Sequence, residues 1–409
     1  MKKAGYPGSN PGLRIEKAGM RTLRIKRIIQ MSKKEKLIRF YDKNYKKFLI
    51  IPALLILLSL SYLVFFYYQN GDIIYKDVSL TGGTTITFLS EILPSELEAQ
   101  LSQKLSDVSV SAVSDNTGKQ TSLLVTSTQD SGIVKQAIEE IVNHSLDESN
   151  SSIEFTGSSL GRDFYNQLMR AVIFAFILMA LVVFVVFGES KKIKAYSLMI
   201  TLITARLTFP LSIIISIMVF IAAIAVFGYL IYLSKAKKEY YTSIGLLALF
   251  IIIFFYNNYL LIIPLFIALM IIYTYFSVPS IAVILSAFAD IIMPLAIIDL
   301  MGMKISSAGI VAFLMLIGYS VDTDILLTTR VLRRGHSESV NKTTLGAFKT
   351  GITMTLTSIA AILVALVVVY QFNSILNQIF IILAMGLAFD TINTWLTNVC
   401  LIKWYAERK

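Results

Sequence analysis

The segment at residues 278–334 contains two long apolar runs that are separated by a short polar break at residues 302–304. A helix of roughly 20 apolar residues crosses a bilayer, and each run is long enough to do so. The segment therefore predicts a transmembrane helical hairpin.

Three carboxylates interrupt this hairpin: Asp290 in the first run, and Asp322 and Asp324 in the second. Burying an ionised carboxylate in hydrocarbon costs roughly several kcal/mol or more, so such residues normally face a bundle interior and serve transport or relay. Alternatively, Asp322 and Asp324 are solvated at a helix end beside Arg330. Because Asp322 lies farther from Arg330, we expect it to lie deeper and to matter more for function than Asp324.

The composition agrees with a polytopic membrane protein. Of the 409 residues, 56% are hydrophobic and 15% are charged, and the mean hydropathy is +0.70. Residues 1–47 hold fifteen Lys and Arg against three acidic residues, which accounts for the formal charge of +11. This basic block precedes the first apolar run, so it indicates a cytoplasmic N-terminus and attraction to anionic membrane lipid rather than nucleic-acid binding. Residues 1–30 are expected not to be native, with Met31 as a natural start.

Residues 69–163 have the composition of a soluble domain between a first span at residues 48–68 and a second at residues 168–187. The residue periodicity predicts strands and helices in the order βαββαβ, which is the ferredoxin-like α+β pattern. The expected strands are residues 84–90, 108–113, 122–127 and 152–155, and the expected helices are residues 94–104 and 130–143, with a turn at 116–118. Gly82, Gly83 and Thr84 open the first strand, where the glycines would permit a close backbone approach.

An apolar segment at residues 188–277 follows the second span. If both of its ends are cytoplasmic, it must cross the membrane an even number of times, and Lys237 at its middle indicates a cytoplasmic turn. We expect two hairpins, at residues 195–233 and 242–276, although the arm at residues 195–205 is too short to span and would be re-entrant or interfacial. Arg206 would either serve a function in the membrane or extend to its interface.

After the central hairpin we expect a cytoplasmic loop, two more spans and a cytoplasmic tail. Asp390 and Asn393 share a face of the last span, where they either stabilise the bundle or take part in ion movement. The expected fold is a polytopic α-helical membrane protein with one external ferredoxin-like domain, six spans and two inserted hairpins, about ten spans in all. The ranges are 336–349 for the loop, 351–370 and 375–401 for the spans, 371–374 for the turn between them and 403–409 for the tail.

The motif from Gly318 through Tyr319 and Ser320 to Arg330 resembles the fourth-helix signature of the SecF family of protein-export membrane proteins, in its archaeal form. The bacterial pattern would place Asn at Asp322, Asp at Thr323 and Thr at Asp324, whereas the sister protein SecD has Asp in place of Asp322. The resemblance covers the first span, the external domain and a four-helix core at residues 278–402. It leaves open which aspartate has the family's role.

The resemblance implies an accessory of the Sec machinery in the cytoplasmic membrane that works with SecD, a SecYEG-type channel and an exported polypeptide. It implies ion or proton coupling through Asp290, Asp322, Asp324 and Asp390. No catalytic triad, metal-ligand cluster or nucleotide motif occurs in the sequence, so we expect neither an enzyme nor a cofactor. Two other classes stay open: an exporter of the related resistance-nodulation-division type, and a scaffold or insertase without ion flow. Such an exporter would carry a second external domain, and the sequence contains one.

Overall fold

The computed structural model describes residues 33–114, 119–208, 213–234, 237–255, 262–333, 339–369 and 375–408. The turns predicted at residues 116–118 and 371–374 lie outside these ranges, as do residues 1–30. The chain divides into two compact units, residues 1–48 and 49–409. In the first unit the described element is the basic helix α2 (Lys33–Phe48). Everything below concerns the second unit.

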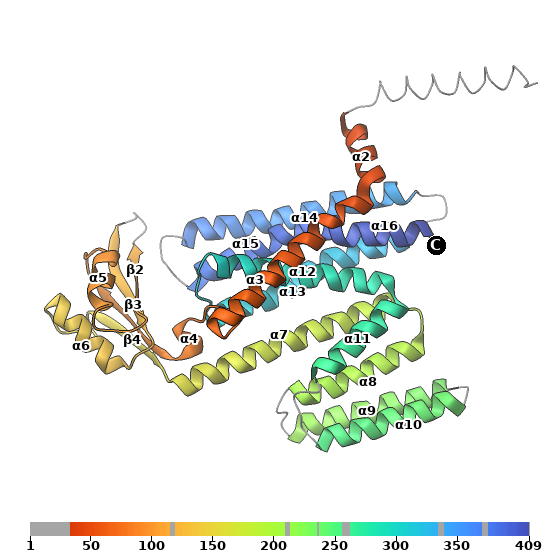
Figure 1. Ribbon diagram of the computed structural model, residues 1–409, viewed down its shortest axis with the longest axis horizontal. Helices are drawn as coiled ribbons and strands as arrows, with labels where there is room; N and C mark the ends of the chain where they lie inside the picture. Colours follow the sequence, from red (N-terminus) through yellow and green to blue (C-terminus); the bar gives the residue numbers. More distant parts are fainter. Residues whose placement is uncertain are drawn as a thin grey trace, which may run out of the picture. The chain divides into compact units, whose positions relative to one another are not determined.

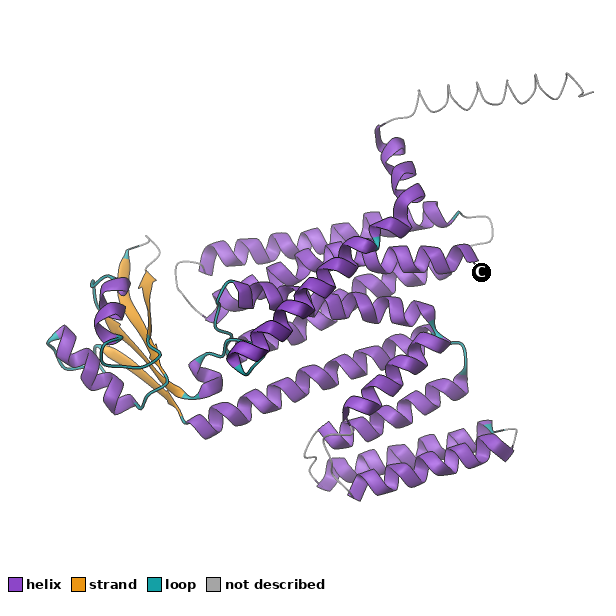
Figure 2. Cartoon of the chain, in the orientation of Figure 1, coloured by secondary structure: helices purple, strands orange, loops and turns teal. Residues whose placement is uncertain are grey.

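The second unit contains a small α/β domain and a larger set of long helices (Figure 2). The domain has a four-stranded antiparallel sheet with the strand order β2-β3-β1-β4. Two helices interrupt the strands, so the order along the chain is βαββαβ. The elements are β1 (Gly83–Leu89), α5 (Pro94–Leu101), β2 (Ser109–Ser114), β3 (Gln120–Ser127), α6 (Ser131–Val142) and β4 (Ser151–Thr156).

Alternating apolar residues form the core of this domain. Ile86 and Phe88 on β1, and Leu123 and Val125 on β3, are buried on one face of the sheet, because side chains alternate between the two faces of a strand. Asp130 caps α6 by accepting a hydrogen bond from the Gly132 backbone, as its sequence position predicts. The predicted strands and helices of this domain all occur, with ends that differ by one to three residues.

The remaining elements of the second unit are helices, apart from the loops that connect them (Figure 1). The central hairpin has the predicted form, with a break between α12 and α13. Before the sheet come α3 (Ile50–Asn70) and the short α4 (Val78–Thr81); after it come α7 (Ser158–Phe187), α8 (Lys191–Thr208), α9 (Ile213–Leu233), α10 (Lys237–Phe255), α11 (Ile262–Phe276), α12 (Val278–Leu300), α13 (Ser307–Leu332), α14 (Val340–Val369), α15 (Ile375–Asn393), the π-helix η3 (Thr394–Asn398) and α16 (Val399–Arg408).

Within the described ranges, seven helices are long and apolar enough to cross a membrane. They are α3, α7, α9, α12, α13, α14 and the continuous run from α15 to α16. Of the four helices in the insertion, α9 meets this measure, while the apolar parts of α10 and α11 are shorter. The protein is therefore a mostly helical, multi-pass membrane protein with seven candidate spans among the described residues. The total of about ten spans stays a prediction.

Two other boundaries differ from the sequence-based expectation. Helix α14 begins at Val340, so the predicted loop at residues 336–349 is largely helical. The predicted tail at residues 403–409 continues the last helix to Arg408, and Lys403 is buried there with 2% exposure. Apolar periodicity marks where a membrane helix is buried, and it does not mark where the same helix continues through polar residues.

Candidate functional site

Helices α12, α13 and α15 pack against one another around a core that includes Leu295, Leu316 and Leu387. Three aspartates from these helices are buried together in the bundle: Asp290 from α12, Asp324 from α13 and Asp390 from α15. Their exposed fractions are 0%, 0% and 1%. We call this group, with its hydrogen-bond partners, the carboxylate cluster.

Asp290 joins three helices. Its Oδ2 accepts a hydrogen bond of 2.5 Å from the Ser320 hydroxyl on α13, and its Oδ1 accepts one of 2.6 Å from Asn393 Nδ2 at the end of α15. Both partners are buried, Ser320 to 1% and Asn393 to 0% exposure. Hydrogen bonds to charged groups contribute about 1.5–3 kcal/mol each. Because the two donors lie on α13 and α15, the hydrogen bonding of Asp290 depends on the positions of all three helices.

Asp324 is held mainly by one amide. Asn398 Nδ2 lies 2.9 Å from Asp324 Oδ1 and 3.2 Å from the Asp324 carbonyl oxygen, and Asn398 also contacts the Thr328 hydroxyl at 3.3 Å. On α13, Ser320, Asp324 and Thr328 are spaced four residues apart, which places them on one face of the helix. All three are buried, so this face of α13 forms a polar stripe within an apolar bundle.

The π-helix η3 brings further polar groups to the cluster. Its wider turn places Thr394, Thr397 and Asn398 in the interior, each with 0–2% exposure. The Thr394 hydroxyl donates to Asp390 Oδ1 at 3.2 Å. Single π turns inside α-helices are rare and occur frequently at functional sites. The sequence gives no periodic signal for this one.

Several polar atoms of the cluster have no hydrogen-bond partner among the described residues. They are Asp324 Oδ2, Asp390 Oδ2, Asn393 Oδ1, Thr397 Oγ1 and Ser286 Oγ. Buried polar atoms are normally paired, and Asp290 and Asp390 also interact electrostatically with Asp324. Three ionised carboxylates in this setting would repel one another, so the arrangement is suited to binding protons.

The structure distinguishes the two aspartates on α13 by their burial in the chain. Asp324 is fully buried, whereas Asp322 is exposed on the surface of the chain. Residues two positions apart on a helix are separated by about 200°, so these aspartates point in nearly opposite directions. Burial in the chain depends on the side of the helix, whereas the expected difference in membrane depth stays a prediction. The relative importance of Asp322 and Asp324 for function is a separate matter and stays a prediction.

The other motif residues are separated. Ser320 contacts Asp290, whereas Gly318 and Tyr319 are exposed. Arg330 donates to the Thr350 hydroxyl at 2.9 Å and so connects α13 to α14. The motif therefore contributes Ser320, Asp324 and Thr328 to the buried polar face of α13, while Gly318 and Tyr319 lie on its exposed side.

The glycines at the start of the sheet domain permit the close approach that the sequence predicts. Gly82 has φ +84°, and a Cβ at this position would lie 2.6 Å from the Ser158 backbone nitrogen at the start of α7. A Cβ at Gly161 would lie 2.5 Å from the Gly82 nitrogen. Side chains at these positions would separate the domain from α7.

A second connection holds the domain to the bundle. The Ile305 amide donates to the Tyr75 carbonyl at 2.6 Å, and the Asp77 amide donates to the Ile305 carbonyl at 3.0 Å. We call these two hydrogen bonds the linker ladder, because they join the linker at residues 71–77 to the loop between α12 and α13. Gln378 at the start of α15 contacts the same loop through Lys304 and Ser306.

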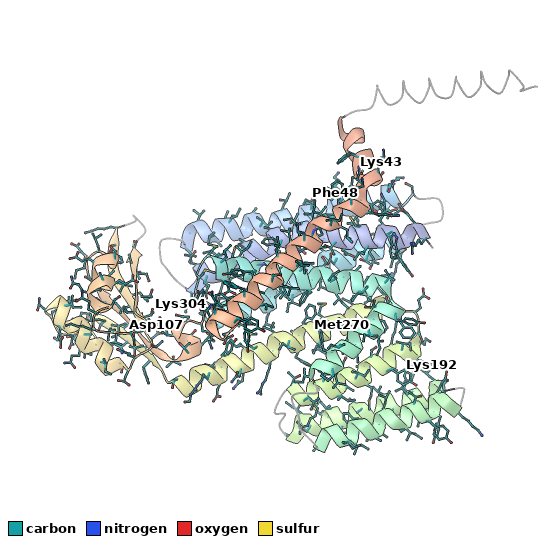
Figure 3. All side chains as sticks on the ribbon, in the orientation of Figure 1. Lys43, Phe48, Asp107, Lys192, Met270 and Lys304 are labelled. Carbon is teal, nitrogen blue, oxygen red and sulfur yellow. The ribbon has the colours of Figure 1, made fainter. Side chains whose placement is uncertain are left out.

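An ion pair adds a contact from the sheet domain to this loop. Lys304 Nζ lies 3.2 Å from Asp107 Oδ1, and both side chains lie at the domain side of the bundle in Figure 3. Exposed ion pairs contribute about 0–1 kcal/mol, so the linker ladder and the glycine contact carry more of the connection. The ends of α12, α13 and α15 are thus joined to the sheet domain.

Sequence reasoning identified Asp290, Asp324, Asp390 and Asn393, and the structure brings all four together. It missed Ser320 as a partner of Asp290, and Thr394, Thr397 and Asn398 in η3. The available signal was the run of Asn and Thr at residues 393–398 in an otherwise apolar span. Within the described residues, no group of three or more His, Cys, Asp or Glu is arranged to hold a metal ion.

The chain is similar to known proteins over most of its length. The family model described as "Protein export membrane protein SecD/SecF, C-terminal" matches residues 252–408. The protein-export membrane protein SecF of Methanocaldococcus jannaschii is 32% identical over 371 residues, which cover 89% of this chain and 96% of the relative. The SecF of Pyrococcus furiosus is 25% identical over 378 residues, covering 92% of this chain and 96% of the relative.

Other matches are shorter or more distant. The SecF of Haloferax volcanii is 50% identical over 129 residues, covering 31% of this chain and 44% of the relative. Among solved structures, the crystal structure of SecDF, a translocon-associated membrane protein from Thermus, has 14% identity and a TM-score of 0.48, covering 90% of this chain and 38% of that chain.

The fold and the cluster define a multi-pass membrane protein whose helices bury ionisable groups, a class that includes transport and relay proteins. Full-length similarity to the Methanocaldococcus relative then identifies the family: this chain belongs to the SecF family of protein-export membrane proteins. Its role is that of an accessory in Sec protein export.

Proposed function

We propose that this chain works with SecD to assist the movement of polypeptides across the cytoplasmic membrane, and that proton binding at Asp290, Asp324 and Asp390 is coupled to this movement. The observation that carries the proposal is the burial of three carboxylates in one bundle, held by partners on different helices. Changing their charge changes which helix positions satisfy them. The loop contacts at the ends of these helices would pass the change to the sheet domain.

The sheet domain is proposed to be ferredoxin-like. Its βαββαβ chain order, its strand order β2-β3-β1-β4 and its antiparallel pairing support this assignment. We propose that it lies outside the cell membrane and contacts the emerging polypeptide. We propose residues 69–163 as its bounds, between the spans at residues 48–68 and 168–187; in the structure the sheet domain follows α3 and precedes α7, which begins at Ser158.

The proposed topology places both termini in the cytoplasm. Basic residues before α3 and the Lys residues at the start of α8 support this orientation. The insertion at residues 188–277 contains the helices α8 to α11, in which α9 packs against α8 and α10, whereas α11 packs against α8 and α12. We propose that this segment crosses the membrane as two hairpins before the four-helix core at residues 278–402. Labelling of a cysteine at Lys237 in a Cys400→Ser background tests this topology, and labelling from outside by an impermeant reagent would refute it.

SecD is the proposed partner, and a SecYEG-type channel the proposed neighbour. The carboxylate of Asp322 on the surface of α13 supports a protein partner, because a lipid-facing carboxylate is costly. Tagged chain should co-purify with a SecD-like protein under mild detergent. Extraction of the chain alone, while the channel complex stays intact, would remove the support for this partnership.

The coupling itself is tested by matched substitutions in cells where this chain replaces the resident SecF. We expect Asp290→Asn and Asp324→Asn to reduce secretion of a reporter at unchanged protein level, because each removes a titrating group and keeps its size. Asp322→Asn is the matched comparison on the same helix. Normal secretion by both cluster variants would make the carboxylates structural. Loss of secretion by Asp322→Asn alone would move the function to the surface of α13.

A further inference from the structure

A fourth carboxylate is buried in the bundle, apart from the carboxylate cluster. Asp299 lies in the last turn of α12 and is 2% exposed. Nine residues separate it from Asp290, which corresponds to about 14 Å along a helix. Neither of its carboxylate oxygens has a hydrogen-bond partner among the described residues. Nothing in the sequence distinguishes Asp299 from an ordinary polar residue at a helix end.

The groups around Asp299 come from three other elements. Tyr62 is on α3, Asp72 and Tyr75 are in the linker, and Tyr165 is on α7. The Tyr75 backbone amide favours the charged form electrostatically, but its contact does not have hydrogen-bond geometry. Asp72 is a second carboxylate close enough to repel a charge on Asp299.

Two groups of this region, the Lys76 ammonium and the Tyr165 hydroxyl, contact Asp72. Lys76 Nζ lies 2.7 Å from Asp72 Oδ2, and the Tyr165 hydroxyl donates to Asp72 Oδ1 at 2.5 Å. Lys76 also lies over the Tyr165 ring, 4.7 Å from its centroid. Asp72 thus has both an ion-pair partner and a hydrogen-bond donor, and these contacts leave Asp299 with neither a cation nor a donor in hydrogen-bond geometry.

An ionised carboxylate in such a site is strongly unfavourable, whereas the neutral acid can remain buried at far lower cost. The linker residues Asp72 and Tyr75 lie close to Asp299, so hydration of an ionised Asp299 would displace the linker. Movement of the linker would therefore act on the linker ladder, which joins Tyr75 and Asp77 to Ile305, six residues after Asp299.

We propose that Asp299 is a proton-binding site, separate from the carboxylate cluster, whose occupancy closes the linker ladder. With its proton bound, Asp299 packs beneath the linker and the two ladder hydrogen bonds form. When the proton leaves, the charge has to be hydrated, and the linker moves away from the loop between α12 and α13. The proposal concerns this chain alone and does not depend on export being proton-coupled.

The linkage between proton binding and ladder closure determines the direction and the steepness of the pH dependence of opening. The closed ladder holds a proton that the open form releases, so raising the pH favours opening. At pH values between the pKa of the open form and the pKa of the closed form, the equilibrium constant for opening rises about tenfold per pH unit for a single proton. Ladder hydrogen bonds should therefore be most protected at low pH.

Hydrogen exchange of the full chain in lipid nanodiscs tests this directly. Protection of peptides covering residues 71–77 and 303–307 is measured from roughly pH 5 to pH 8, after correction for the pH dependence of chemical exchange. We expect wild-type protection to fall about tenfold per pH unit over part of this range. Asp299→Asn, which is neutral at every pH, should hold the low-pH level of protection throughout.

Asp107→Asn is the matched control, because it removes an exposed carboxylate that contacts the same loop through Lys304. It should keep the wild-type slope. A flat corrected profile in the wild type overturns the proposal without any variant. Retention of the slope by Asp299→Asn, or loss of ladder protection in this variant at every pH, also overturns it.

Discussion

The carboxylate cluster and the insertion both bury polar side chains, but they satisfy them differently. In the cluster, Asn393 on α15 donates to Asp290 on α12, so the hydrogen bond crosses between helices. In the insertion, Thr201, Thr204 and Thr208 on α8 are buried, and each hydroxyl donates to a carbonyl four residues earlier on its own helix.

This difference determines what each region can do. A hydroxyl that is satisfied within its own helix stays satisfied when neighbouring helices move. An amide and a carboxylate that are satisfied across helices lose their partners when either helix shifts, and an unpaired buried group costs about 1–3 kcal/mol. The cluster therefore links charge to helix position, whereas the α8 hydroxyls mainly allow close packing around Ile203 and Leu207.

The insertion does have cross-helix polar contacts near the start of α8. Lys192 pairs with Glu239 on α10 at 2.7 Å, and the Tyr196 and Ser243 hydroxyls lie 3.3 Å apart. Lys192 is labelled in Figure 3, at the start of α8 beside the connection from α7. The pair is partly solvated, so its contribution falls in the range of surface ion pairs.

The largest effect is expected from removing the donor of Asp290. Asn393→Leu leaves Asp290 Oδ1 without its amide in a buried site, and should lower the free energy of unfolding by about 3 kcal/mol. Thermal unfolding of the purified chain in detergent measures this change. A variant as stable as the wild type would show that the cross-helix bond contributes nothing, and the comparison would fail.

A smaller loss is expected at the second cross-helix pair. Asn398→Leu should cost about 2 kcal/mol, because Asp324 then has no amide partner. Adding Asp324→Leu should recover most of this loss, since replacing both partners by apolar groups is nearly neutral. A double variant whose loss equals the sum of the two single losses would indicate that the pair is not coupled.

The insertion should respond weakly to the matching change. Thr204→Val keeps a side chain of similar size and removes a buried hydroxyl that donates to the Ile200 carbonyl in the same helix. We expect a loss of about 0.5 kcal/mol in the same unfolding assay. A loss as large as that of Asn398→Leu would mean that the α8 hydroxyls also act between helices.

The weakest effect is expected on the surface of the sheet domain. The Lys104 ammonium donates to Glu140 at 2.6 Å, and this hydrogen bond is the main reason that the pKa of Glu140 lies below its usual value. A lowered folded-state pKa stabilises the fold above the unfolded pKa, and this stabilisation is lost as the pH falls through the folded pKa.

Hydrogen exchange of α6 in the full chain should therefore be slightly faster in Glu140→Gln than in the wild type at neutral pH. The two should become equal in acid, once the pH has fallen below the lowered folded-state pKa of Glu140. A difference that persists in acid would assign the effect of the substitution to packing.

The sequence predicted those parts of the fold in which periodicity and burial coincide. Leu123 and Val125 alternate with more exposed residues, and Asp130 precedes an amphipathic run, so the strands and α6 could be placed. Asp290, Asp324 and Asp390 were identifiable because carboxylates in apolar runs are rare. Their grouping was not predictable, because which helices face one another depends on packing between segments far apart in the chain.

The errors have the same origin. Asp322 and Asp324 are two residues apart, and only the helix orientation shows which is buried. The π-helix at Thr394 adds one residue to a turn, which no hydrophobic period reveals. Asp299 was overlooked because its environment is made by Tyr62, Asp72 and Tyr165 from other elements.

The linker ladder and its neighbouring contacts also constrain how the chain is made. The Ser79 hydroxyl accepts a hydrogen bond from the Ser307 amide, 228 residues later. A ribosome adds these residues over about 10–50 s at 5–20 residues per second. Throughout that interval the sheet domain can complete its own core, but the backbone groups of the linker must be hydrated. Docking of the domain onto the bundle is thus a late step of biogenesis, which waits for insertion of α12 and α13.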